Sequence, residues 1–172
     1  VTGASATADY RNIFNTFGWI VEIDPFAPTP TPLKHSALGR FAHEGCWPCK
    51  AVACKPVVFY MGDDSRNEYI YKFVSKAVWD AADVGKGHVA GQKYMGEGTL
   101  YVAKFNADGS GTWVELTHGK NGLDASNATY AFADQADVVV HARLPGDVVG
   151  ATKMDRPEWC SVNPTNGAVY MT

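Results

Sequence analysis

Five residues near the end of the chain combine an arginine, a carboxylate and a large aromatic side chain: Asp155-Arg156-Pro157-Glu158-Trp159. Pro157 fixes its own φ and favours an extended conformation at Arg156. Because side chains alternate along an extended segment, Arg156 and Glu158 are expected to point the same way. A guanidinium fork suits a phosphate group, and a carboxylate suits a metal ion. A surface ion pair beside a core tryptophan explains the same pattern, so both interpretations stay open here.

Other polar side chains with possible chemistry lie earlier in the chain. His43 stands beside Glu44, which precedes a glycine at the expected end of an extended segment. A histidine next to a carboxylate is a candidate ligand or proton shuttle, although a packed or solvated histidine is more common. Asp63 and Asp64 share a turn, and oxygen-rich turns suit Ca²⁺. Aspartates also favour turns without any metal, so this pair is ambiguous by itself.

Three of the four cysteines are close in sequence, at positions 46, 49 and 54, and the fourth is Cys160. A C-x-x-C pair is typical of a redox site or of half a zinc site. The redox interpretation requires a helix start in a βαβ context, which the flanking sequence lacks. The zinc interpretation requires a second pair, and only Cys160 remains. Structural thiols, with at most one disulfide, are the favoured interpretation.

The elements that must position these residues are mainly strands. Apolar and aromatic runs predict strands over 17–23, 57–61, 68–75, 99–105 and 112–116. Asn166-Gly167 between apolar runs predicts a final hairpin, with Glu158 at the start of one strand and Val169 on its partner. One short helix is expected over 135–144, capped by Asp134, with a further helical turn over 147–152. Residues 1–15 are expected to form a connecting segment. Residues 76–98 and 118–152 are expected to be insertions between the strands.

The bulk composition is that of a soluble globular protein. The chain has 172 residues, of which 46% are hydrophobic and 19% charged, and its formal net charge is −3. This charge gives no reason to expect nucleic acid as a partner. No apolar run has the length of a membrane span. The chain lacks a starting Met and a signal sequence, so we expect a mature or trimmed fragment that forms one partial domain.

Several segments together resemble one known family. They are NTFGWIVEIDPF, ALGRFAHEG, YMGDDSRNEYIYKFVS, GTLYVAKFNADGSGTW and ATKMDRPEW, and they span the chain from about residue 15 onward. In this order they closely resemble the PhoX-type alkaline phosphatases. The resemblance implies a mainly β chain whose antiparallel sheets form about two blades of a six-bladed β-propeller. Such a fold directs a charged residue at the start of an innermost strand, as expected for Glu158, into the central channel.

The resemblance also implies a site and a reaction. A cluster of Fe³⁺ and Ca²⁺ in the channel would hydrolyse phosphate monoesters. Glu44 and Glu158 match metal-bridging carboxylates, and Arg156 matches the arginine that clamps the phosphate. Asp63 matches a Ca²⁺ ligand, with Asp64 as the second choice. The family is exported in bacteria, so a periplasmic or extracellular location is expected.

The sequence departs from the family in two ways. The family's chains are several times longer, so this chain is expected to carry only part of the site and to be inactive alone. Open sheet edges would then favour self-association. The cysteine run is also unlike the family. Two other functions therefore remain: a non-catalytic module that binds Ca²⁺ or a protein, and a thiol or zinc protein.

Overall fold

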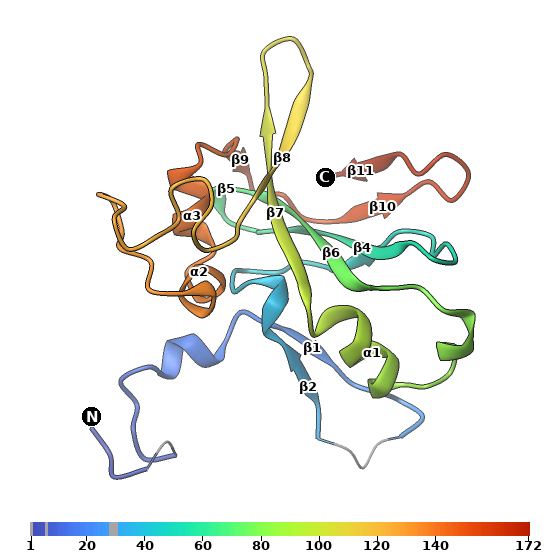
Figure 1. The fold of residues 1–172 in the computed structure, drawn as a ribbon, viewed down its shortest axis with the longest axis horizontal. Coiled ribbons are helices and arrows are strands. Elements are labelled where there is room, and N and C mark those ends of the chain that lie inside the picture. The colour runs from blue at the N-terminus through green and yellow to red at the C-terminus, as the bar shows by residue number, and fades with distance from the viewer. Residues whose placement is uncertain (1, 6, 28–30) are drawn as a thin grey trace.

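Antiparallel strands dominate the computed structural model, which describes residues 2–5, 7–27 and 31–172 (Figure 1). The largest sheet has five strands in the order β3-β4-β6-β7-β8. Their bounds are β3 (Trp47–Pro48), β4 (Pro56–Gly62), β6 (Ile70–Val78), β7 (Gly98–Phe105) and β8 (Gly111–Glu115). Three two-stranded pieces surround it: β1 (Ile20–Glu22) with β2 (Leu33–His35), β5 (Arg66–Glu68) with β9 (Met154–Asp155), and β10 (Cys160–Val162) with β11 (Val169–Met171). The predicted mainly-β, antiparallel class is confirmed.

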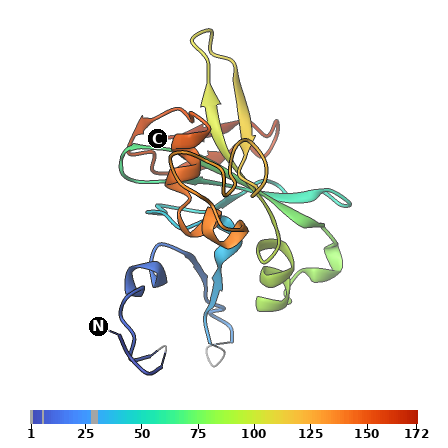
Figure 2. The same ribbon diagram turned by 60° about the vertical axis from the view of Figure 1, so that its left-hand side comes forward.

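One face of the five-stranded sheet forms the core. Tyr69, Tyr71 and Phe73 are almost fully buried on this face, which confirms the alternation predicted for this segment. Helices α2 (Gln135–Val140) and α3 (Arg143–Val148) cover it, and the Tyr71 hydroxyl donates to the carbonyl of Ala142 at 3.2 Å. Figures 1 and 2 show these helices grouped on one side of the sheet.

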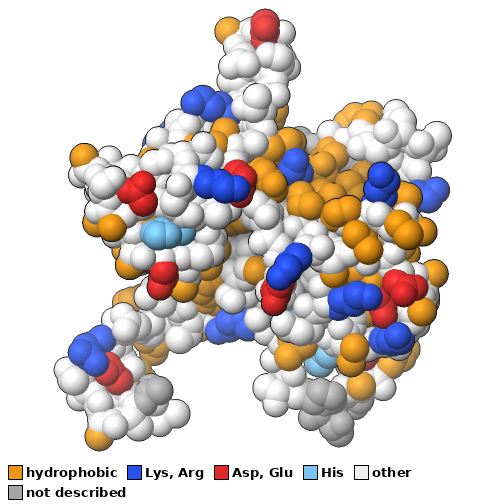
Figure 3. Space-filling model, in the orientation of Figure 1, with side chains coloured by type: hydrophobic (Ala, Val, Ile, Leu, Met, Phe, Trp, Pro, Cys, Tyr) orange, Lys and Arg blue, Asp and Glu red, His pale blue; other side chains and the backbone are white. Residues whose placement is uncertain are grey.

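The opposite face of the sheet is only partly covered. Trp47, Tyr60, Lys72 and Tyr101 are successive cross-strand partners from β3 to β7. The Lys72 ammonium lies 4.8 Å from the ring centroid of Trp113 and 4.9 Å from that of Tyr101. Figure 3 shows hydrophobic side chains gathered over the part of the sheet next to the β10–β11 hairpin.

The helical segment after residue 134 differs from its prediction. Asp134 does cap it, accepting a hydrogen bond from the Asp137 amide at 2.8 Å. However, α2 ends at Val140 and a separate α3 follows, so the prediction of one helix over 135–144 is wrong. Pro145 explains the break, because it has no N–H to donate to the carbonyl of His141. In α3 the same proline lies in the first turn, where no N–H is needed.

The prediction of an unstructured insertion over 76–98 is also wrong. Strand β6 continues to Val78, and the short 3₁₀ helix η3 (Ala81–Asp83) and helix α1 (His88–Met95) follow. Two further 3₁₀ turns are η1 (Ile13–Thr16) and η2 (Ser36–Leu38). No helix among the described residues has the length and apolarity needed to cross a membrane.

Several other predictions of elements are confirmed. The final hairpin forms, with Val162 opposite Val169 and with Gly167 at φ 72° in its loop, but its first strand begins at Cys160, so the prediction that Glu158 starts this strand is wrong. The β7–β8 hairpin forms as expected. The predicted strand over 17–23 is reduced to the three residues of β1. The described part of the N-terminal segment extends away from the sheet in both ribbon views (Figures 1 and 2).

Candidate phosphate and metal site

The connection between β4 and β5, residues 62–65, brings the predicted site segments together. We call it the 62–65 turn. The amide of Glu44 donates to the carbonyl of Gly62 at 3.4 Å. The amide of Arg156 donates to the carbonyl of Ser65 at 3.2 Å. The two segments that carry the predicted glutamates are therefore both anchored on one turn, although they are far apart in sequence.

Gly62 allows the second segment to approach closely. A Cβ atom at this position would lie 2.2 Å from the carbonyl oxygen of Pro157 and 2.8 Å from that of Glu158. Real Cβ atoms do not tolerate such contacts with backbone, so the absence of a side chain is what admits the 157–158 segment. Glu44 and Glu158 thus both lie against the same glycine.

Arg156 has a conformation that the sequence did not predict. Its φ is 53°, in the left-handed region, so the predicted extended conformation is wrong. The hydrogen bond to Ser65 and the pairing of Asp155 with Arg66 hold the chain in this shape. Non-glycine residues in this region are strained, and such strain is concentrated at functional sites.

The Arg156 and Glu158 side chains point towards each other and remain accessible. The Arg156 Nη1 atom lies 3.5 Å from Glu158 Oε1, and its Nε atom lies 3.8 Å from Asp155 Oδ1. The Arg156 side chain is 56% exposed and that of Glu158 is 37% exposed. Loose, solvent-exposed pairs of this kind contribute little stability. Both groups are therefore free to exchange this contact for a ligand.

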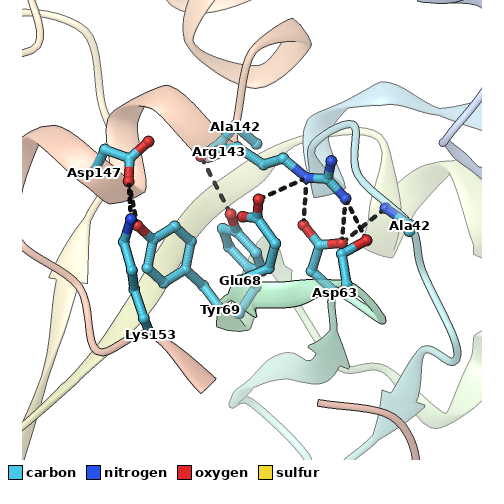
Figure 4. A network of polar contacts seen from close by, with 10 residues as sticks. Ala42, Asp63, Glu68, Tyr69, Ala142, Arg143, Asp147 and Lys153 are labelled. Carbon is cyan, nitrogen blue, oxygen red and sulfur yellow. Dashed lines mark hydrogen bonds and ion pairs between the residues drawn. The ribbon is translucent and has the colours of Figure 1, made fainter. Parts of the chain in front are cut away.

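Asp63 is held in a different way. Its side chain has no exposed surface, and Arg143 contacts both of its oxygens, with Nε 2.8 Å from Oδ2 and Nη2 2.7 Å from Oδ1. The amide of Ala42 adds a hydrogen bond to Oδ1 at 3.1 Å. Figure 4 shows the Arg143 guanidinium between Asp63 and Glu68. Both oxygens of Asp63 are thus occupied by the fold, which disfavours this residue as a metal ligand.

Asp64 has the free coordination capacity that Asp63 lacks. Its Oδ1 atom is buried, and no described residue forms a hydrogen bond with it. The Asp64 amide donates to the carbonyl of Ala42 at 2.9 Å, which fixes the backbone. Burying a carboxylate oxygen without a partner is costly. A cation at this position would remove that cost.

His43 lies beside these carboxylates in a neutral state. It packs on Phe41, and burial lowers the pKa of its imidazole to about 4. Its Nε2 atom lies 2.9 Å from the carbonyl of Gly39, which fits a hydrogen bond donated by that nitrogen. Its Nδ1 atom is buried and finds no partner among the residues that the structure describes. The imidazole therefore keeps a lone pair available.

The site is incomplete as a metal centre. Within residues 2–5, 7–27 and 31–172, no three His, Cys, Asp or Glu side chains lie close enough together to hold an ion. Carboxylate oxygens are the right donors for hard cations such as Ca²⁺ and Fe³⁺. The chemistry of these donors thus fits the predicted metals. The described residues that converge here are too few to form a complete metal site by themselves.

A second group of polar residues extends the network around Arg143 (Figure 4). The Tyr69 hydroxyl donates to Asp147 at 2.5 Å, and Lys153 lies 3.1 Å from the same carboxylate. Burial raises the pKa of Glu68, whose Oε1 atom is 3.6 Å from Arg143 Nε. The sequence analysis missed Arg143, because an arginine at a helix start carries no motif. The signal in the sequence was the pair of aspartates at 63 and 64, because a buried carboxylate needs a positively charged partner.

The thiols do not form an alternative site. All four cysteines are free. Burial raises the pKa of Cys46 to about 12 and that of Cys160 to about 11, so both thiols stay protonated near neutral pH. This contradicts a thiolate that titrates near neutrality. The interpretation of the cysteines as structural thiols is the one that the structure favours.

Comparison with known proteins gives the class that this fold and site define. The family model described as "Alkaline phosphatase PhoX" matches residues 2–172. The chain belongs to the PhoX alkaline phosphatase family.

A solved structure supports this assignment. The structure described as "Pseudomonas fluorescens PhoX in complex with vanadate, a transition state analogue" is 48% identical to this chain, with a TM-score of 0.85. The match covers 97% of this chain and 29% of that one, so the chain spans less than a third of the length of this relative. A comparison with curated proteins gives no significant match.

Proposed function

We propose that this chain contributes part of the site of a phosphomonoesterase. Family membership and the vanadate complex of the Pseudomonas fluorescens relative support this activity. The observation that carries the proposal is the convergence of the Glu44 and Arg156–Glu158 segments on the 62–65 turn. Phosphate monoesters are the substrate class.

Each side chain has a proposed role. Arg156 binds the phosphoryl oxygens, for which a guanidinium fork provides matched donors. Glu44, Glu158 and Asp64 hold metal ions, and Asp64 takes precedence over Asp63 because its Oδ1 atom lacks a partner among the described residues. Asp63 acts indirectly, by fixing Arg143 and the 62–65 turn.

Fe³⁺ and Ca²⁺ are the proposed metals, since both are hard ions that prefer carboxylate oxygen. When bound, such ions polarise a phosphoryl group and hold the attacking oxygen. The described residues do not converge as a complete ligand set, so we propose that the missing ligands lie outside these 172 residues. Accordingly, the chain alone is expected to be inactive. We also propose a periplasmic or extracellular location, as implied by the resemblance to the exported PhoX-type phosphatases.

A chimera tests the function directly. These 172 residues would replace the matching 29% of the Pseudomonas fluorescens PhoX chain, and turnover of a chromogenic phosphate ester would be measured with Ca²⁺ and Fe³⁺. We expect the chimera to be active, and Arg156→Gln to lower turnover by at least about a hundredfold, as loss of a preorganised charge donor typically does.

The matched control is Arg11→Gln, which removes the same charge from an exposed arginine whose ion-pair partner among the described residues is Asp9. It should leave turnover unchanged. A folded chimera without activity, or an Arg156→Gln variant with full activity, would overturn the proposal.

A second candidate function is a non-catalytic module that binds Ca²⁺. The buried Oδ1 atom of Asp64, which has no partner among the described residues and suits a cation, is compatible with it. Elemental analysis distinguishes the two candidates, because calcium without iron, together with an inactive chimera, would support the binding module.

A further inference from the structure

A small pocket lies beside the candidate site and plays no part in the function proposed above. Its volume is about 280 Å³, which is smaller than the usual range for drug-sized ligands, roughly 300–1,000 Å³. Its lining residues are Phe17, Gly18, Arg40, Phe41, Ala42 and Arg143. Two arginines in so small a space point to an anionic ligand.

Arg40 brings a charge that the fold does not neutralise. Its Nε atom donates to the carbonyl of Val140 at 2.7 Å, and its Nη1 atom donates to the carbonyl of Phe14 at 3.4 Å. Within the described part of the chain, no carboxylate lies at ion-pair distance and no acceptor contacts Nη2. Backbone carbonyls thus hold the guanidinium in place and leave both its charge and one amino group available.

Arg143 supplies a second group of donors. Asp63 and Ser65 engage its Nε and Nη2 atoms, as described above. Its Nη1 atom meets no acceptor among the residues described, and Figure 4 shows it without a dashed contact. Asp63 and, at 3.6 Å, Glu68 face the charge of Arg143, so Arg40 is the lining arginine whose charge no described carboxylate compensates.

The other walls of the pocket strengthen anion binding. Phe41 is buried, and a buried apolar wall reduces the local dielectric and strengthens charged hydrogen bonds on that side of the pocket, whereas Phe17 lies on the solvent side. Gly18 has φ 80°, and a Cβ atom there would lie 3.0 Å from the carbonyl oxygen of Phe41. Glycine therefore keeps this wall close to the arginines without filling the space between them.

The pocket adjoins the candidate site through two residues. The Ala42 amide donates to Asp63, and the Ala42 carbonyl accepts from the Asp64 amide. Ser65 accepts from Arg143 through its hydroxyl and from the Arg156 amide through its carbonyl. The two arginine sites are thus distinct but share the 62–65 turn.

We propose that Arg40 and Arg143 form a second oxyanion site that binds a phosphate group separately from Arg156. The phosphate has two possible sources, free inorganic phosphate and a second phosphate group on the ligand held at Arg156. The proposal goes beyond the hydrolysis proposed above and does not depend on it, because binding can be measured without turnover.

The test is a titration of the metal-free 172-residue chain with inorganic phosphate, followed by NMR. We expect saturable shifts at the amides of Gly18 and Ala42, which line the pocket. Arg40→Gln should weaken this binding at least about tenfold, which corresponds to about 1.4 kcal/mol. Arg11→Gln removes the same charge elsewhere and should have no effect. Arg156→Gln should leave the shifts at Gly18 and Ala42 intact.

The absence of shifts at Gly18 and Ala42 in the unmodified chain would overturn the proposal. So would shifts that Arg40→Gln leaves unchanged. If Arg40→Gln prevents folding, Arg40→Lys is the second variant, because it retains the charge but lacks the planar guanidinium. It should bind phosphate more weakly than the unmodified chain. An affinity equal to that of the unmodified chain would contradict phosphate binding by the guanidinium of Arg40.

A second arm identifies the source of the phosphate. Propane-1,3-diol bisphosphate and the corresponding monophosphate would be compared on the same amides. Tighter binding of the bisphosphate that Arg156→Gln abolishes would assign the pocket to a second group of the same ligand. Equal affinities would assign it to free phosphate.

Discussion

Two adjacent aspartates in the 62–65 turn have opposite environments. Asp63 has both oxygens bonded to Arg143, and it is fully buried. Asp64 has a buried oxygen with no partner among the described residues. The first arrangement is that of a residue that stabilises the fold. The second leaves a buried oxygen to which no described residue donates.

Substitution of each aspartate by asparagine tests this difference. Asp63→Asn removes the buried carboxylate that pairs with Arg143, whose side chain is 41% exposed, and loss of such a hydrogen-bonded partner typically costs about 1–3 kcal/mol. Asp64→Asn removes an unpaired charge whose burial is costly, so the free energy of unfolding should stay the same or rise. Urea denaturation of the two variants measures both values. Equal losses of stability would contradict the assigned roles.

At the residue scale, the sequence predicts the acidic side chains but not their partners. Glu44, Asp63 and Glu158 stood out because turns and strand ends often carry such groups, with Asp64 as the second choice to Asp63. Arg143 was not, because its contact with Asp63 spans 80 positions and depends on how α3 packs against the sheet. The left-handed conformation of Arg156 also depends on a distant hydrogen bond, to Ser65.

At the element scale, Asp83 joins two segments that the sequence analysis did not recognise as ordered. Its side chain is only 8% exposed, at the end of η3. It accepts hydrogen bonds from Lys93 at 2.6 Å and Tyr94 at 2.5 Å, both in α1, and from Lys86 at 3.1 Å. These bonds, with that from Lys93 first, hold the pKa of Asp83 well below its usual value.

The lowered pKa predicts a pH dependence of stability. In the unfolded chain an aspartate carboxyl has a pKa of about 4. Because the pKa of Asp83 is lower in the folded chain, its carboxylate stabilises the fold above pH 4, and this contribution is lost progressively as the pH falls below that value. Asp83→Asn should therefore destabilise the chain at pH 7. The difference from the unmodified chain should shrink below pH 4. Urea denaturation at pH 7, 5 and 3 measures it, and a difference that stays constant with pH would argue against this role.

The same elements show why local sequence was insufficient. Residues 88–95 include Gly91, which is unfavourable within a helix. A Cβ atom at Gly91 would lie 1.9 Å from Glu22 Oε2, so a larger residue there would push this carboxylate away from its 2.7 Å contact with His35 Nε2. A helix of eight residues would be only marginally stable in isolation. The formation of α1 therefore depends on its tertiary contacts.

At the scale of the whole molecule, the five-stranded sheet has two free edges. Among the residues that the structure describes, β3 pairs with β4 alone and β8 pairs with β7 alone. An unpaired edge strand can pair with another chain. The strand sequences predicted the class of fold, whereas the strand order and its free edges follow from contacts between distant segments.

The free edge of β8 predicts self-association. We expect the average mass of the chain to rise above the monomer value of 18.6 kDa with concentration, as measured by sedimentation velocity. Thr112→Lys places a charge at an exposed position of β8 and should reduce association, because lysine on an edge disfavours pairing. Thr129→Lys adds the same charge in an exposed loop and should not. A chain that stays monomeric at all concentrations would contradict this prediction.

The central claim is that Glu44 and Glu158, anchored on one turn, bind the same metal centre. A double-mutant cycle in the chimera tests it most directly, with metal affinity measured for Glu44→Gln, Glu158→Gln and the double variant. We predict that each single substitution lowers the metal affinity at least about tenfold. The double variant should bind the metal almost as well as the single variant with the lower affinity, because the effects of substitutions at interacting positions are not additive. Losses that simply multiply, or single variants with unchanged affinity, would contradict a shared centre.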